Sequence, residues 1–224
     1  MKPNRSQISL TAVAALMCLV ALPLSAQEPD SGNQLYEVTV INLTAGQIIS
    51  PPIVYSHRGR FELFTPGEAA IPELASLAED AAGDDLVALL TAEPLVADVA
   101  VAGDGVIPGD SMTVEIEVPY GFRYVSALGM LVTTNDAFMA ATSKVPANGK
   151  AFYGLAWDAG SEANTQDCDH IPGPPCGSGG IRVEDGAEGF VYIHTGIQAR
   201  GDLDPEIHDW RNPVAKIEIR RVSH

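Results

Sequence analysis

The sequence is poor in basic residues and has few cysteines and aromatic residues. Its 224 residues include 13 Lys and Arg against 29 Asp and Glu, a formal charge of −16. Such a chain lacks the positive surface with which proteins bind nucleic acids and anionic membranes, so we expect neither as a partner. Beyond residue 26 no apolar run is long enough to cross a bilayer, which predicts no membrane insertion of the remaining chain.

The long apolar run that does occur spans residues 8–24. Two basic residues precede it, and the small residues Ser25 and Ala26 follow it. This order is typical of a secretory signal peptide at 1–26, cleaved after Ala26, and it predicts export to the periplasm or the medium. A membrane anchor is the alternative, but the run is short for a span and no basic stop-transfer cluster follows it. The polar residues 27–34 predict a flexible N-terminal segment.

Only Cys168 and Cys176 remain after removal of the signal peptide, in the stretch DCDHIPGPPCG. In an exported protein two nearby cysteines most often form a disulfide, here across a loop rich in proline and glycine. The alternative is a transition-metal site made of Cys168, His170 and Cys176. That site lacks an obvious fourth ligand and requires reduced thiols, so we predict the disulfide.

Alternation of apolar and polar residues dominates the chain from Leu35 onward. It is clearest in LYEVTVIN and SMTVEIEV, and it is typical of half-buried strands. Residues 66–92 are instead rich in Ala, Leu and Glu and predict one or two short helices. No repeat and no glycine-rich nucleotide motif favours a parallel sheet. We therefore predict an all-β, antiparallel β-sandwich of about eight strands in one domain at 35–224, with further strands in PLVADVAVAG, FRYVSALGMLVTT, AFYGLAW, GFVYIHTGI and NPVAKIEIRRV.

Three acidic residues stand in two short loops between residues 131 and 162. Asp136 lies in the first loop, and Asp158 and Glu162 lie in the second, with an apolar strand leading into each. Folding can bring these three carboxylates together at one edge of a sheet. A cluster that offers only oxygen ligands suits a hard cation such as Ca²⁺.

Several stretches carry a resemblance to a known family. They are TNDAFMA, YGLAWDAGSEAN, an Ile-Pro before a glycine-rich loop, and DWRNPVAKIEIRRV, together with YEVTVINLT and SHRGRFELFTPGEAAIPELASLAED. In this order they resemble the spondin N-terminal domain, and more specifically the bacterial secreted proteins that carry it. The resemblance covers about residues 35–222.

The resemblance implies a C2-like antiparallel β-sandwich that holds a divalent cation, Ca²⁺, in loops at one end. The aspartate of the family's first loop falls on Asp136, and the two acids of its second loop fall on Asp158 and Glu162. Ser161 stands where the family usually has threonine. Glu162 stands where animal members have aspartate.

For function, the resemblance favours an exported, calcium-dependent module for recognition or adhesion, whose partner is an extracellular or envelope protein or glycan. A structural envelope protein with a stabilising ion is the alternative. A hydrolase that uses the acidic cluster, with His194 or His208 as acid or base, is a third hypothesis. We expect no enzyme, because no nucleophile elbow, H-E-x-x-H motif or Ser/His/Asp constellation is found in the sequence.

Overall fold

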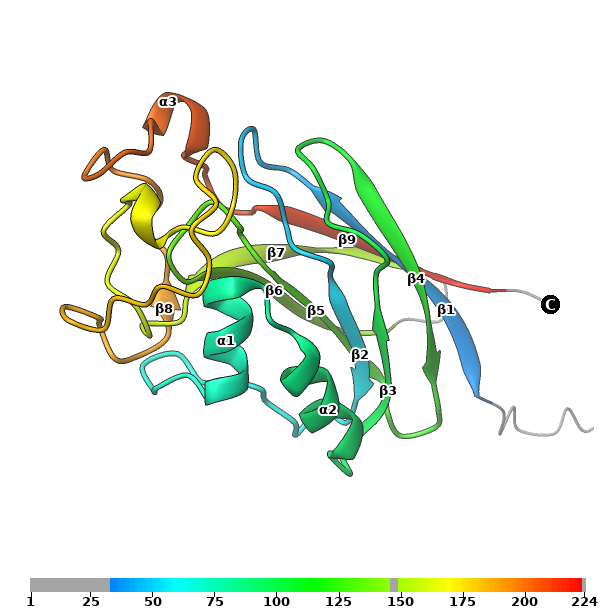
Figure 1. Ribbon diagram of the computed structural model, residues 1–224. Helices are drawn as coiled ribbons and strands as arrows, with labels where there is room; N and C mark the ends of the chain where they lie inside the picture. The colour runs from blue at the N-terminus through cyan, green and yellow to red at the C-terminus, as the bar shows by residue number, and fades with distance from the viewer. Residues whose placement is uncertain (1–32, 146–148, 223–224) are drawn as a thin grey trace, which may run out of the picture. The chain divides into compact units, whose positions relative to one another are not determined.

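The computed structural model of the protein describes residues 33–145 and 149–222 (Figure 1). The predicted signal peptide at 1–26 and residues 27–32 of the predicted flexible segment lie outside the described residues. Gln34 already belongs to the first strand, one residue before the expected start of the domain. No helix in the two described ranges is long and apolar enough to span a membrane.

The strands form an antiparallel sheet in the order β3-β2-β5-β6-β7-β9-β1-β4, with β8 beside β7, and this confirms the predicted all-β class. One strand, β7, joins two halves of this sheet. Its last four residues pair with β6 and its first five pair with β9, so the sheet continues from one layer to the other. The strand bounds are β1 Gln34–Asn42, β2 Ile53–His57, β3 Val96–Val101, β4 Ser111–Val118, β5 Tyr124–Met130, β6 Ala137–Lys144, β7 Lys150–Asp158, β8 Tyr192–Ile193 and β9 Ala215–Arg221.

Side chains of β3 and its neighbour β2 link one edge of the sheet to β4 at the other edge. Asp98 on β3 accepts the backbone N–H of Glu117 on β4 at 2.7 Å, and the Ser56 hydroxyl donates to the Glu117 carbonyl at 2.7 Å. The two layers therefore close into a sandwich that is nearly a barrel. The predicted alternation of β1 and β4 is confirmed, since their apolar side chains face the interior: Tyr36, Val38, Val40, Ile116 and Val118 are buried there, and Met112 and Val114 are partly buried.

Two short helices, α1 (Pro72–Asp80) and α2 (Asp84–Ala92), cover the outer face of β2, β5 and β6 (Figure 1). Their leucines make a second core with residues of these strands: Leu74, Leu77, Leu86 and Leu90 pack with Ile53, Tyr55, Leu128 and Phe138. Because both faces of β2 are covered, all five of its residues are buried. The prediction of one or two short helices at 66–92 is confirmed.

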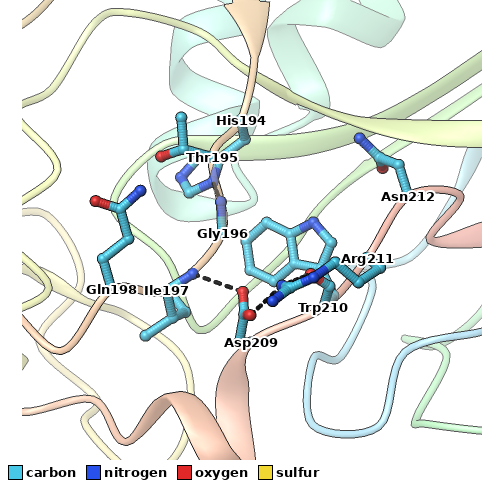
Figure 2. A pocket seen from close by; sticks show the side chains of 9 residues that line it. All are labelled: His194, Thr195, Gly196, Ile197, Gln198, Asp209, Trp210, Arg211 and Asn212. Atoms are coloured by element: carbon cyan, nitrogen blue, oxygen red, sulfur yellow. Dashed lines mark hydrogen bonds and ion pairs between the residues drawn. The ribbon is translucent and has the colours of Figure 1, made fainter.

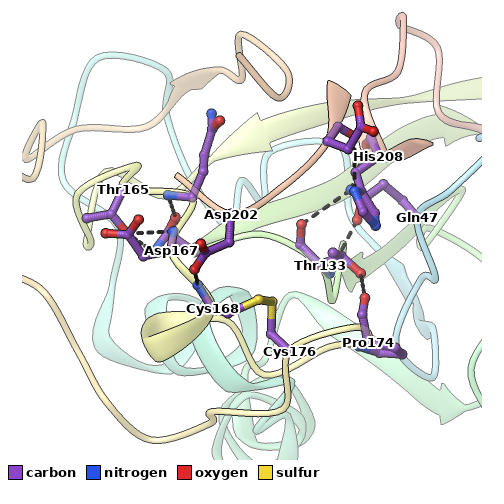
Figure 3. The surroundings of a disulfide bond; sticks show 12 residues. Gln47, Thr133, Thr165, Asp167, Cys168, Pro174, Cys176, Asp202 and His208 are labelled. Atoms are coloured by element: carbon purple, nitrogen blue, oxygen red, sulfur yellow. Dashed lines mark hydrogen bonds between the residues drawn. A yellow bond between two sulfur atoms is a disulfide. The ribbon is translucent and has the colours of Figure 1, made fainter. Parts of the chain in front are cut away.

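The chain between β7 and β9 is mostly irregular and gathers at the end of the sheet where β6 begins and β7 ends (Figure 1). Within it, Cys168 and Cys176 form the predicted disulfide, with Cα atoms 4.8 Å apart (Figure 3). Pro174 in the bridged loop accepts the Thr133 hydroxyl at 2.7 Å. The disulfide loop is thus fastened to the loop that precedes β6. Beyond these elements the chain has only a 3-10 turn at Cys168–His170 and the single-turn helix α3, Pro205–His208, within the described part.

Candidate cation site

The pairing of β6 with β7 places two of the predicted ligands side by side. In this antiparallel pair Ala137 faces Asp158, so Asp136 and Asp158 lie at the same end of the sheet. The backbone N–H of Ala159 donates to the Asp136 carbonyl at 3.1 Å and continues this pairing into the loops. The expectation that the two loops meet in space is therefore met for Asp136 and Asp158.

One carboxylate oxygen of Asp136 is fully used and the other is not. Oδ2 accepts the backbone N–H groups of Ser161 at 2.8 Å and Glu162 at 3.0 Å, and it lies 3.3 Å from the Ser161 hydroxyl. Oδ1 is buried and has no hydrogen-bond partner among the described residues. The Asp136 side chain is 0% exposed, so protein groups rather than bulk solvent must compensate its charge.

Asp158 is buried beside it and is held by the loop that follows β7. Oδ1 accepts the backbone N–H of Gly160 at 2.8 Å, and Oδ2 accepts the Asn164 amide at 2.7 Å. Gly160 has φ +66°, and a Cβ there would lie 2.3 Å from the Phe190 carbonyl oxygen. Only glycine fits this turn, which bends the DAGSE segment back over Asp136.

The two buried carboxylates repel each other. Burial and then the charge of Asp158 hold the pKa of Asp136 well above its usual range, against two backbone N–H donors that act to lower it. Burial also raises the pKa of Asp158 to about 6. Either a proton or a cation between the two carboxylates would remove this repulsion, and the two would compete for the same oxygens.

Glu162 contributes to the site through its main chain rather than its carboxylate. Its N–H donates to Asp136, while Oε1 accepts the backbone N–H of Val183 at 3.1 Å. Burial raises the Glu162 pKa to about 7, and the charges of Glu79 and Asp80 add to this effect. The carboxylate of the third predicted ligand thus lies in the surroundings of α1 and the 177–186 loop, apart from the Asp136–Asp158 pair.

Four residues surround Asp158, and the sequence pointed only to His194 among them, as a candidate acid or base. The Asn164 amide also lies 3.3 Å from Glu188 Oε1, and the Tyr192 hydroxyl donates to that oxygen at 3.0 Å. His194 Nε2 donates to Asn164 Oδ1 at 3.0 Å and lies 3.6 Å from Asp158 Oδ2. Asn164 lies only six residues after Asp158, in the same loop. Glu188 belongs to a stretch that reads as an ordinary turn.

No group of three or more His, Cys, Asp or Glu side chains in the described chain is arranged to hold a metal ion. The alternative metal site at Cys168, His170 and Cys176 is replaced by the disulfide. Comparison of the chain with models of known protein families and with curated proteins gives no match.

Proposed function

We propose that the protein is an exported, Ca²⁺-binding β-sandwich module of the spondin N-terminal type that serves recognition or adhesion outside the cell. The observation that carries the proposal is Asp136 Oδ1, a buried carboxylate oxygen without a partner in the described chain. The negative charge of Asp158 also repels the carboxylate to which this oxygen belongs. A bound cation would satisfy that oxygen and neutralise both charges.

The donor set supports Ca²⁺ rather than a softer metal. Asp136 and Asp158 supply oxygen ligands, and no cysteine thiol is available beside them because both described cysteines are in the disulfide. Ca²⁺ takes six to eight oxygens and tolerates irregular geometry. Glu188 adds negative charge near this pair, since its charge acts on both aspartates. Backbone carbonyls and water would complete the shell.

The surroundings of the site favour binding over catalysis. His194, the histidine nearest to the carboxylates, has both ring nitrogens engaged: Nδ1 accepts the backbone N–H of Gly196 at 2.9 Å and Nε2 donates to Asn164. Burial lowers its pKa to about 4, so the ring is neutral at pH 7. A histidine held in this way orients its neighbours and has no free nitrogen with which to exchange a proton with a substrate.

Calorimetric titration of the mature protein with Ca²⁺ after EDTA treatment tests the proposal. Wild type should bind one ion, and its melting temperature should rise in millimolar Ca²⁺ because the ion prefers the folded state. Asp158→Asn should weaken binding by about tenfold or more, since it removes one of few charged ligands. Glu115→Gln, on the exposed face of β4, is the matched control and should bind as wild type does. Absence of binding to wild type would overturn the proposal.

A further inference from the structure

A polar pocket of about 270 Å³ lies beside the candidate cation site. Two segments line it: residues 194–198, which follow β8, and residues 209–212, which precede β9 (Figure 2). Residues 199–208 separate these segments, and the backbone N–H of Ile197 joins them by donating to Asp209 at 3.0 Å. The volume is slightly below the roughly 300 Å³ at which pockets for drug-sized ligands begin, so it suits one small ring.

Aromatic rings form the floor of the pocket. Trp210 is 7% exposed, and its ring lies 5.0 Å from the His194 ring at an angle of 37°. The hydrogen bonds of His194 to Gly196 and Asn164 fix that ring in place. The floor therefore consists of two fixed, mutually tilted rings, and the exposed part of Trp210 can pack against a ligand ring.

The rim of the pocket carries neutral polar groups and one ion pair. Thr195, Gln198 and Asn212 are exposed there, and Asn212 Oδ1 is oriented by the backbone N–H of Ala156 at 2.7 Å. Asp209 and Arg211 form an ion pair at the same rim. Hydroxyl, amide and ionic groups thus offer donors and acceptors together, without an excess of either charge.

This combination selects a class of ligand. An apolar ligand would bury the rim groups without partners, which costs free energy. An ionic ligand would meet a charge that is already paired. A ligand with a flat face and several hydroxyl groups satisfies both floor and rim. We propose that this pocket binds a neutral saccharide residue.

A chain of hydrogen bonds connects the pocket floor to the candidate cation site. His194 Nε2 donates to Asn164 Oδ1, and the Asn164 amide donates to Asp158 Oδ2 at 2.7 Å. A cation on Asp158 would fix Asn164 and therefore the ring that supports Trp210. Only this expected effect of Ca²⁺ rests on the proposed function; the saccharide site itself rests on the pocket.

Intrinsic fluorescence can report binding at this place, because Trp157 and Trp210 are the two tryptophans of the chain. Trp157 packs against Phe64 on the opposite side of the sheet, with ring centroids 5.2 Å apart. Trp157→Phe keeps an aromatic ring there and leaves Trp210 as the reporter. The probes are methyl pyranosides of neutral hexoses and N-acetylhexosamines, with a methyl uronate as the charged counterpart, each titrated in Ca²⁺ and in EDTA.

We expect a saturable change in Trp210 fluorescence with at least one neutral glycoside at millimolar concentration. Gln198→Ala and Thr195→Val, both at exposed rim positions, should each weaken that binding by about 3- to 10-fold through loss of a hydrogen bond. Thr113→Val, on the outer face of β4, should leave it unchanged. Removal of Ca²⁺ should weaken binding by about 5-fold, at the low end of typical coupling between sites.

The outcomes separate the two proposals. If no neutral glycoside binds while Ca²⁺ still binds in calorimetry, the saccharide site is wrong and the cation site stands. Binding of the uronate alone, or binding that neither rim variant weakens, also overturns the saccharide site. If a neutral glycoside binds with the same affinity in Ca²⁺ and EDTA, the pocket stands and its link to Asp158 is overturned. Saccharide binding without any Ca²⁺ binding overturns the cation site alone.

Discussion

Asp136 accepts the backbone N–H of Ser161 at 2.8 Å, and this bond joins the loop before β6 to the loop after β7. It commits one oxygen of the Asp136 carboxylate to holding the loops together. The other oxygen remains buried with no partner in the described chain. The side chain therefore has a structural half and a half available to an ion, and substitutions can separate the two roles.

Replacing Asp136 by asparagine should retain the structural half and remove the charge. The amide oxygen can still accept from Ser161 and Glu162, while the repulsion with Asp158 disappears. At pH 7 in EDTA we expect Asp136→Asn to raise the free energy of unfolding, because burial and the charge of Asp158 both disfavour an ionised carboxylate at this position. The Ca²⁺-induced rise in melting temperature should disappear. Urea unfolding and thermal melts measure both effects.

Asp136→Ala is the informative counterpart, because it removes both halves. The N–H groups of Ser161 and Glu162 then lack their acceptor inside the protein. We expect the free energy of unfolding to fall by about 2–4 kcal/mol. Equal stability of the alanine and asparagine variants would show that the loop bonds contribute nothing.

Ca²⁺ affinity should depend on the charge of Glu188 and not on that of Glu162. Glu162→Gln leaves a side-chain oxygen for the N–H of Val183 and does not touch the aspartate pair, so Ca²⁺ affinity should change less than about 2-fold. Glu188→Gln removes a charge that acts on Asp136 and Asp158, and affinity should fall about 5- to 10-fold. Calorimetry of both variants checks this. A large loss in Glu162→Gln together with wild-type affinity in Glu188→Gln would restore Glu162 as the third ligand.

Without a divalent cation, the free energy of unfolding should fall as the pH rises from 4.5 to 7. The folded state raises the pKa of Asp158 to about 6 and of Glu162 to about 7, and it raises that of Asp136 as well. Groups with raised pKa values bind more protons when folded, so raising the pH through this window removes their stabilising protonation. Chemical unfolding at three pH values in EDTA measures the trend.

His194 works in the opposite direction. Burial lowers its pKa to about 4 in the folded state, so the unfolded state binds more protons between pH 4 and 6.5. The contribution of His194 to the free energy of unfolding therefore rises with pH in this range. Three carboxyl groups oppose this one imidazole, and we expect them to dominate. Asp158→Asn should flatten the profile, and saturating Ca²⁺ should do the same by neutralising the ionised carboxylates. A profile that rises with pH in EDTA would contradict the prediction.

The sequence was sufficient to predict the strands whose two faces differ in burial. Period-two alternation located β1 and β4, since each has one face in the interior and one in solvent. In β2 every residue is buried, because α1 and α2 cover its outer face. Its alternation is lost for this reason, and its central place between β3 and β5 follows only from pairing over long sequence distances.

The candidate site was predictable where a strand end fixes the residue. Asp136 and Asp158 flank paired strands, so antiparallel pairing alone brings them together. The direction of the Glu162 carboxylate depends on Val183 in a long irregular loop, and the positions of Glu188 and His194 depend on the same chain segment. No local pattern encodes the path of such a loop, because individual hydrogen bonds and the disulfide determine it.

The disulfide should stabilise the fold without being required to hold the Asp136 and Asp158 carboxylates in position. Cys168→Ser with Cys176→Ser opens a loop of eight positions, and the loop-entropy relation assigns about 2.5 kcal/mol to such a closure. The Asp136 and Asp158 carboxylates keep their own backbone donors in the 160–162 turn, which does not include the cysteines. We therefore expect the double variant to unfold at lower urea concentration yet to bind Ca²⁺ within about 3-fold of wild type at temperatures where it is folded. Loss of Ca²⁺ binding by a variant that circular dichroism shows to be folded would mean that the bridged loop itself holds the two aspartates in place.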